Sequence, residues 1–73
     1  MAMGEAVPLV SSNVASVAFD PDEQTLEVTF NSGAVYQYFA VDESVYMSFL
    51  AAPSPGRFLW QNLRGVYDYN RLA

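Results

Sequence analysis

The residues best suited to chemistry in this sequence are two arginines, Arg57 and Arg64, in a segment that is predicted to form a short helix. They are seven residues apart, so on an α-helix they lie about two turns apart on one face. Ser54 and Gly56 stand at the expected start of that helix, where free backbone N–H groups and the helix dipole attract anions. These four residues predict a site for a phosphate or a carboxylate. The competing interpretation is that Ser54 only caps the helix, Gly56 allows close packing, and the arginines pair with acidic residues.

A second candidate is a pair of tyrosines, Tyr36 and Tyr38, at alternate positions of a predicted strand. Alternate aromatic side chains on a sheet stack bases in several proteins that bind single-stranded nucleic acids. Whether these tyrosines reach solvent depends on the register of the hairpin that contains them. A two-residue turn at Ser32-Gly33 would place Gln37 on the buried face, where an unpaired amide costs about 1–3 kcal/mol.

We therefore favour a three-residue loop, Asn31-Ser32-Gly33, with its glycine in the left-handed conformation and Val28 opposite Tyr36. This register turns Tyr36 and Tyr38 toward the core and Gln37 toward water. Base stacking on the tyrosines is then the second interpretation, and a role in the core is the first.

More aromatic residues occur here than the core of so short a chain needs. Trp60 either fills the core or is exposed, and Tyr46, Tyr67 and Tyr69 are further candidates for partial exposure. Exposed aromatic surface is typical of protein interfaces. The sequence therefore also predicts a protein partner or a homo-oligomer.

Catalysis has little support in this composition. Histidine and cysteine are both absent, and with them the commonest general base, the most reactive thiol and the usual zinc ligands. Asp20, Asp22 and Glu23 lie close together, but they occupy a predicted turn between strands, where solvated carboxylates are the ordinary interpretation. We expect no catalytic residues, no metal site and no cofactor, and we expect that the protein is not an enzyme.

The charge of the chain is unevenly distributed. Its 73 residues carry a net charge of −5. Seven of the eight acidic residues fall in residues 1–43, and all three arginines fall in residues 44–73. An acidic protein is repelled by nucleic acid unless its basic groups gather on one face. With no apolar run of about 20 residues and no signal-peptide pattern, we expect a cytoplasmic protein without membrane contact.

The hydrophobic periodicity predicts an α+β fold. Residues 1–8 are expected to form a flexible N-terminal tail, and residues 9–73 a single domain. Strands are predicted over residues 14–19, 25–30 and 35–38. The first has Ala15, Val17 and Phe19 on one face. A first helix is predicted over residues 42–52, and a second from Ser54-Pro55 to Gly65.

The predicted arrangement is a three-stranded antiparallel β-meander followed by two α-helices packed on one face, in the order β-β-β-α-α. The last residues, 66–73, fit either an extended strand or a short turn, and both remain open.

The run from Ser11 to Arg71 resembles the KTSC domain family, which is named for its occurrence at the C-terminus of some lysyl-tRNA synthetases and also includes free-standing small proteins. The matching segments are SSNV, DPDEQTLEVTF, GAVYQY, SPGRF and NLRGVYDYNR. Two features differ from the family pattern. Asp42 stands where the family often has a proline, and Trp60 stands where it more usually has a polar residue.

The resemblance implies a binding function rather than an established activity. RNA binding has been suggested for the family because of the synthetase association, which is an argument from context. If that role applies, the positions that carry over are Tyr36, Tyr38, Arg57, Arg64 and Tyr67. The sequence thus predicts a non-catalytic binding module that contacts RNA or another anionic ligand through its C-terminal half. The alternative is a small protein-interaction or self-associating protein without a nucleic-acid role.

Overall fold

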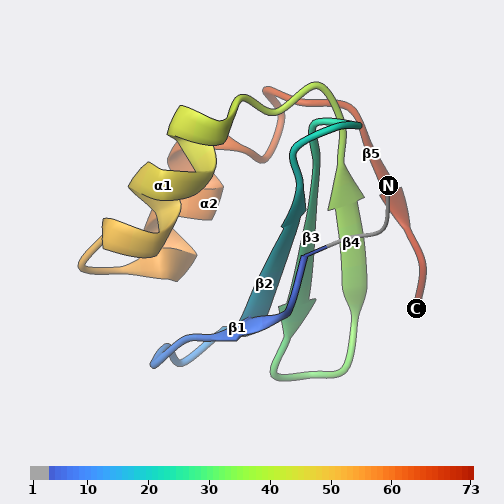
Figure 1. Ribbon diagram of the computed structural model, residues 1–73. Helices are drawn as coiled ribbons and strands as arrows, with labels where there is room; N and C mark the ends of the chain where they lie inside the picture. The colour runs from blue at the N-terminus through green and yellow to red at the C-terminus, as the bar shows by residue number, and fades with distance from the viewer. Residues whose placement is uncertain (1–3) are drawn as a thin grey trace.

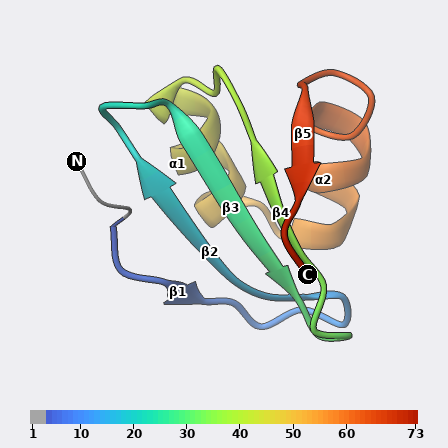
Figure 2. The same cartoon turned by 90° about the vertical axis from the view of Figure 1, so that its right-hand side faces the viewer.

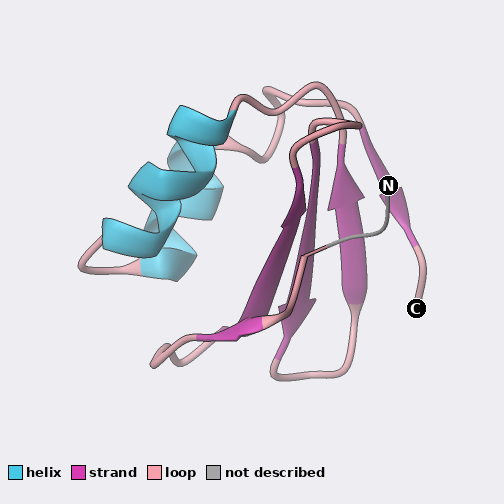
Figure 3. Ribbon diagram, in the orientation of Figure 1, coloured by secondary structure: helices cyan, strands magenta, loops and turns pink. Residues whose placement is uncertain are grey.

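A five-stranded antiparallel sheet with two helices on one of its faces makes up the protein (Figures 1 and 3). The computed structural model describes residues 4–73. The strands follow one another across the sheet in the order β1-β2-β3-β4-β5 (Figure 2). Their bounds are β1 Val7–Pro8, β2 Val14–Asp20, β3 Thr25–Phe30, β4 Val35–Tyr38 and β5 Tyr69–Arg71, and those of the helices are α1 Glu43–Ala51 and α2 Pro55–Asn62.

The central hairpin of β3 and β4 has the predicted register. Val28 lies opposite Tyr36, and Leu26 lies opposite Tyr38. The Gly33 N–H donates to the Phe30 carbonyl oxygen at 2.9 Å, and Gly33 has a φ of +95°. The three-residue loop with a left-handed glycine is therefore confirmed.

Because side chains alternate along a strand, this register points Gln37 away from the helices. Its amide donates to the Glu27 carboxylate at 3.3 Å on the opposite strand. The amide that the alternative register would have buried is thus hydrogen-bonded on the outer face of the sheet.

Two strands extend the predicted meander, so the expectation of three strands was wrong. β1 pairs with β2 through Val7 opposite Val17, and β5 pairs with β4 through Tyr38 opposite Tyr69. Both added strands are short, two and three residues, and neither has a period long enough to detect in sequence. Both alternatives left open for residues 66–73 occur, because Val66 lies in a turn and residues 69–71 form a strand.

The predicted flexible tail over residues 1–8 falls partly outside the described residues, which begin at residue 4. Within the described part, the Gly4 N–H donates to the Phe19 carbonyl oxygen at 3.0 Å, and residues 7 and 8 belong to β1. The ordered sheet therefore begins before the predicted domain boundary at residue 9.

A β-bulge changes which residues of β2 face the helices. The pairing shifts between Val14, opposite Phe30, and Ser16, opposite Thr29. An extra residue in one strand reverses the direction of the side chains before it. Val14 is consequently completely buried in the core, whereas Ala15, which was predicted to share a face with Val17, is only partly buried.

Both helices begin and end close to the predicted residues. α2 starts at Pro55 after Ser54, whose hydroxyl accepts the Arg57 N–H at 3.4 Å. α2 ends at Asn62, three residues before the predicted stop at Gly65, which is left-handed with a φ of +78°. No helix in residues 4–73 has the length and apolar character needed to cross a membrane.

The core lies between the helices and the middle of the sheet. Phe49 of α1 is fully buried and stacks on Phe58 of α2, with ring centroids 5.2 Å apart. Tyr46 of α1 stacks on Phe19 of β2 at 4.9 Å. The buried apolar residues are Val14, Val17, Phe19, Leu26, Val28, Tyr38, Val41, Phe49, Leu59 and Leu63.

The loop glycine gives a direct test of the hairpin geometry. We expect Gly33→Ala to destabilise the protein by about 1–2 kcal/mol, the cost of a left-handed residue with a Cβ. A Cβ at this position would meet no atom within 4 Å, so the loss would be conformational rather than steric. Asparagine tolerates this conformation better, so Gly33→Asn should cost less. Urea denaturation measures both variants, and equal stability of wild type and Gly33→Ala would contradict the assignment.

Candidate functional site

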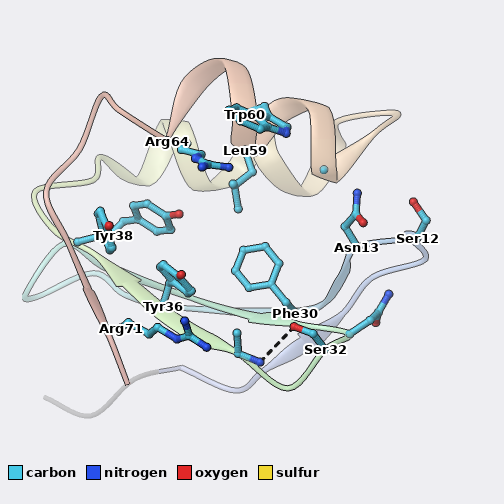
Figure 4. Close-up of a pocket in the computed structure, with 14 residues that line it drawn as sticks. Ser12, Asn13, Phe30, Ser32, Tyr36, Tyr38, Leu59, Trp60, Arg64 and Arg71 are labelled. Atoms are coloured by element: carbon cyan, nitrogen blue, oxygen red, sulfur yellow. Dashed lines mark hydrogen bonds between the residues drawn. The ribbon is translucent and has the colours of Figure 1, made fainter. Parts of the chain in front are cut away.

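A cavity of about 680 Å³ lies between the sheet and α2 (Figure 4). Its floor is the helix-facing side of the hairpin and β5, its roof is α2, and one end is closed by the loop before β2. The lining residues are Ser12, Asn13, Phe30, Asn31, Ser32, Ala34, Tyr36, Tyr38, Gly56, Leu59, Trp60, Arg64, Tyr69 and Arg71.

Four aromatic rings form a continuous floor. The Tyr36 ring centroid lies 5.5 Å from that of Phe30 and 5.4 Å from that of Tyr69. Tyr38 follows, with its centroid 6.0 Å from that of Tyr69. Such aromatic surfaces stack planar groups with little selectivity for their identity. Phe30 meets Tyr36 edge to face at 82°, whereas Tyr36 is stacked on Tyr69 at 29°. A flat, conjugated ligand can therefore stack on one ring face and contact the neighbouring rings by their edges.

The two tyrosines, Tyr36 and Tyr38, lie on the core face of the sheet and also border the cavity. They face the helices, as the favoured register predicts. Tyr38 is only 3% exposed, and Tyr36 is half-buried. The helical layer covers the sheet incompletely at this point, so a side chain on the core face still borders open space.

Trp60 and Arg64 form the roof. The Arg64 guanidinium carbon lies 4.0 Å from the centre of the Trp60 ring, well within the range of a cation–π contact. The chain leaves the α-helix at Asn62, and the Arg64 N–H donates to the Leu59 carbonyl oxygen at 2.8 Å. Trp60 is 61% exposed, so it does not fill the core.

Arg71 brings a second positive charge to the cavity. Its guanidinium carbon lies 5.7 Å from the Tyr36 ring centre, and its Nε donates to the Ala73 carbonyl oxygen at 2.9 Å. The lining residues include two arginines and no aspartate or glutamate. The cavity therefore has a formal charge of +2 in a protein whose net charge is −5. Such a local field favours an anionic ligand.

The neighbouring groups alter the ionisation of the Tyr38 hydroxyl. Burial raises its pKa above the usual value, and Tyr36 and Tyr69 act in the same direction, whereas the positive charge of Arg64 acts in the opposite one. Burial also raises the pKa of Tyr46 between the sheet and α1. Both hydroxyls are therefore neutral hydrogen-bonding groups at physiological pH.

The structure brings together five of the eight sequence-predicted residues. Tyr36, Tyr38, Gly56, Trp60 and Arg64 all line the cavity. The other three do not. Ser54 caps α2, and Arg57 is exposed on α2 away from the cavity.

Tyr67 lines a second, shallower cavity of about 430 Å³ between α1 and α2, together with Val45, Phe58 and Val66. Arg57 and Arg64 therefore do not form the predicted pair on one face. Arg64 lies beyond the end of the helix, where the spacing of two helical turns no longer applies.

Sequence reasoning missed Arg71 and the polar end of the cavity. Arg71 reaches the site only because β5 pairs with β4, and a three-residue strand leaves no readable period. Asn13, Asn31 and their serine neighbours meet because the loop before β2 is hydrogen-bonded to the β3–β4 turn. The signal that could have pointed to Asn13 was the family resemblance, because the segment SSNV, residues 11–14, opens the matching region.

The fold and the cavity together define a small α+β domain with an aromatic, positively charged groove. Comparison with known proteins gives the family. The sequence model of the KTSC domain matches residues 10–67. The crystal structure of a KTSC domain protein from Yersinia pestis superposes with a TM-score of 0.93 and 33% identity, covering 99% of this chain and 100% of that one. The chain therefore belongs to the KTSC domain family, as the sequence motifs indicated.

Two sequence relatives differ in how the domain occurs. An uncharacterized protein of Stutzerimonas stutzeri is 49% identical over 67 residues, which cover 90% of this chain and 94% of that protein. The lysine–tRNA ligase of a Nostoc species is 32% identical over 71 residues, which cover 93% of this chain but only 13% of the ligase. The domain thus occurs both nearly alone and as a small part of a large enzyme.

The raised tyrosine pKa values predict a loss of stability at alkaline pH. A group with a raised folded-state pKa contributes stability that is complete below its unfolded pKa, about 10 for tyrosine, and is lost as the pH rises through the folded value. We expect the thermal midpoint to fall above about pH 10 for this reason. Tyr38→Phe and Tyr46→Phe should each make that fall shallower. Melting curves from pH 8 to 11 check this, and identical pH profiles of the variants and wild type would contradict it.

Proposed function

We propose that this protein is a non-catalytic binding module whose cavity takes single-stranded RNA. The observation that carries the proposal is the combination of a continuous aromatic floor with two arginines, Arg64 and Arg71, and no acidic lining residue. Sequence-tolerant binding of single strands uses this combination, since aromatic rings stack the bases and basic groups hold the phosphates.

The comparisons add context to this proposal. A lysine–tRNA ligase carries a related domain, and a ligase for tRNA has RNA as its partner by name. We extend this context to a cytoplasmic location. We also propose a role without catalysis, because the lining of the cavity contains no histidine, cysteine or carboxylate to act as a base or nucleophile. Tyr38, whose pKa is raised by burial, supplies a neutral hydroxyl to the lining.

The test compares three arginines that differ in position. Short single-stranded RNAs should bind wild type at low salt, and the affinity should fall with salt at a logarithmic slope of about −1.4, because two phosphate contacts each contribute about −0.7. Arg64→Ala and Arg71→Ala should each weaken binding and reduce the slope by about half. Arg57→Ala, which removes an exposed arginine outside the cavity, is the matched control. It should leave the affinity and the salt slope nearly unchanged.

Two results would contradict the RNA-binding proposal. If a panel of single-stranded RNAs shows no binding at low ionic strength, the proposal is wrong. It is also wrong if Arg57→Ala weakens binding as much as the two cavity variants do, because the contact would then follow overall charge rather than the cavity.

A second candidate function is association with a protein, and a separate surface favours it. Met47 of α1 and Val66 beyond α2 are 54% and 64% exposed, and Val66 borders the cavity between the two helices. Exposed apolar side chains beside a groove are typical of interaction sites.

Light scattering at high protein concentration tests self-association through this surface. A dimer held by these residues should persist in about 0.5 M salt, where exposed charge interactions are largely screened. Val66→Ser should then weaken it. A monomer at every concentration would remove self-association.

A further inference from the structure

The two ends of the cavity differ in chemistry. Arg64 lies beside Tyr38 and Arg71 beside Tyr36, whereas Ser12 and Asn13 lie at the opposite end beyond the Phe30 ring (Figure 4). Asn31 and Ser32 of the hairpin turn also border the cavity. One end is therefore positively charged and the other offers neutral amides and hydroxyls. A ligand that matches this pattern has an anionic group, a flat apolar body and a neutral polar edge.

The backbone of Asn13 is held in place by hydrogen bonds on both sides. The Asn13 N–H donates to the Ser11 hydroxyl at 3.2 Å, and the Asn13 carbonyl oxygen accepts the Asn31 N–H at 2.8 Å. The side chain points toward the start of α2 (Figure 4), where a Cβ built on Gly56 would lie 3.0 Å from the Asn13 amide nitrogen. Gly56 therefore leaves the room that this amide occupies.

The side-chain amide of Asn31 makes one hydrogen bond within the protein. The Asn31 side-chain N–H donates to the Ser11 carbonyl oxygen at 3.0 Å. This bond fixes the side chain relative to the loop before β2 and leaves its carbonyl oxygen as an acceptor. In the hydrogen bonds found among residues 4–73, Asn13 takes part only through its backbone. The donor and acceptor of its amide are thus available to a ligand in the cavity.

We propose that the cavity is an adenine-selective nucleotide subsite, an inference that rests on the RNA-binding function proposed above. The base stacks on the Phe30 ring and contacts Tyr36, which meets Phe30 edge to face. Its phosphate lies between Arg64 and Arg71, and its polar edge meets the amide of Asn13. An asparagine amide presents a donor and an acceptor side by side, which matches the acceptor N7 and donor N6 of adenine. Arginine is suited to phosphate because its planar group donates in pairs.

The size of the cavity agrees with a ligand of this kind. Its volume of about 680 Å³ lies within the range of small-molecule sites, about 300–1,000 Å³. The two arginines are the only basic residues of the lining. The subsite therefore takes one or two nucleotides rather than a long strand, and the same chemistry fits either a free nucleotide or an exposed residue of an RNA.

The single tryptophan gives a direct readout, because Trp60 forms part of the roof. Quenching of its fluorescence, with calorimetry as the second measurement, compares the tetranucleotides of A, C, G and U at low salt. We expect the A tetramer to bind about tenfold more tightly than the others, within the usual discrimination of one amide–base pair. AMP and adenosine are measured beside it, and adenosine should bind at least about tenfold more weakly than AMP because it lacks the phosphate.

Two variants and one control address the amide. Asn13→Ala should abolish the preference for A while leaving the affinity for the U tetramer within about twofold. Gly56→Ala keeps Asn13 but displaces its amide, and it should reduce the same preference. Asn70→Ala is the matched control, because Asn70 lies on β5 between two lining residues and alternation points it to the other face of the sheet. Circular dichroism confirms that each variant is folded.

The outcomes separate this inference from the function on which it rests. If the four tetramers bind equally and Asn13→Ala changes nothing, the adenine subsite is wrong and RNA binding stands. If adenosine binds as tightly as AMP, the phosphate position is wrong and the inference fails. If no tetramer or nucleotide binds at low salt, both proposals fail. Tighter binding of AMP than of the A tetramer would identify a free nucleotide as the source, and tighter binding of the A tetramer would identify RNA.

Discussion

The register of the β3–β4 hairpin is the constraint on which the site depends. A shift of one residue would exchange the two faces of β4, so that Gln37 would face the helices and Tyr36 and Tyr38 the outer surface. The left-handed Gly33 and the resulting three-residue loop fix this register. The aromatic floor therefore exists because one glycine allows one turn geometry.

The cavity follows from the small size of the helical layer. Two helices of nine and eight residues cover a sheet of five strands. The buried residues of the sheet come from β2, β3 and the end of β4, which leaves β5 and the rest of β4 less covered. Tyr36 and Tyr69 border open space for this reason, although they belong to the same face as the core. A short chain buries a smaller share of its surface than a long one. Here the part of the sheet that the helices leave uncovered carries aromatic side chains.

Local periodicity predicted the centre of the fold and not its edges. The alternation of Leu26, Val28 and Phe30 and the Ser54-Pro55 start signal gave β3 and the start of α2 correctly. The bulge in β2 arises from pairing with β3, and β5 is defined by its pairing with β4, so neither is encoded in a local pattern. Arg57 lies outside the cavity that Arg64 lines, for a related reason. Helical spacing applies only while the helix continues, and α2 ends before Arg64.

The site is completed by a short, exposed strand at the edge of the sheet. β5 has three residues, all exposed, and it is an edge strand that pairs with β4 alone among the described strands. Short edge elements with few buried contacts open at low free-energy cost. Because β5 supplies Tyr69 and Arg71, an opened β5 would remove one ring of the floor and one of the two positive charges. A ligand that contacts both strands binds only the paired state, so by linkage it must stabilise that pairing. Binding of such a ligand and closure of the sheet edge would therefore form a single coupled equilibrium.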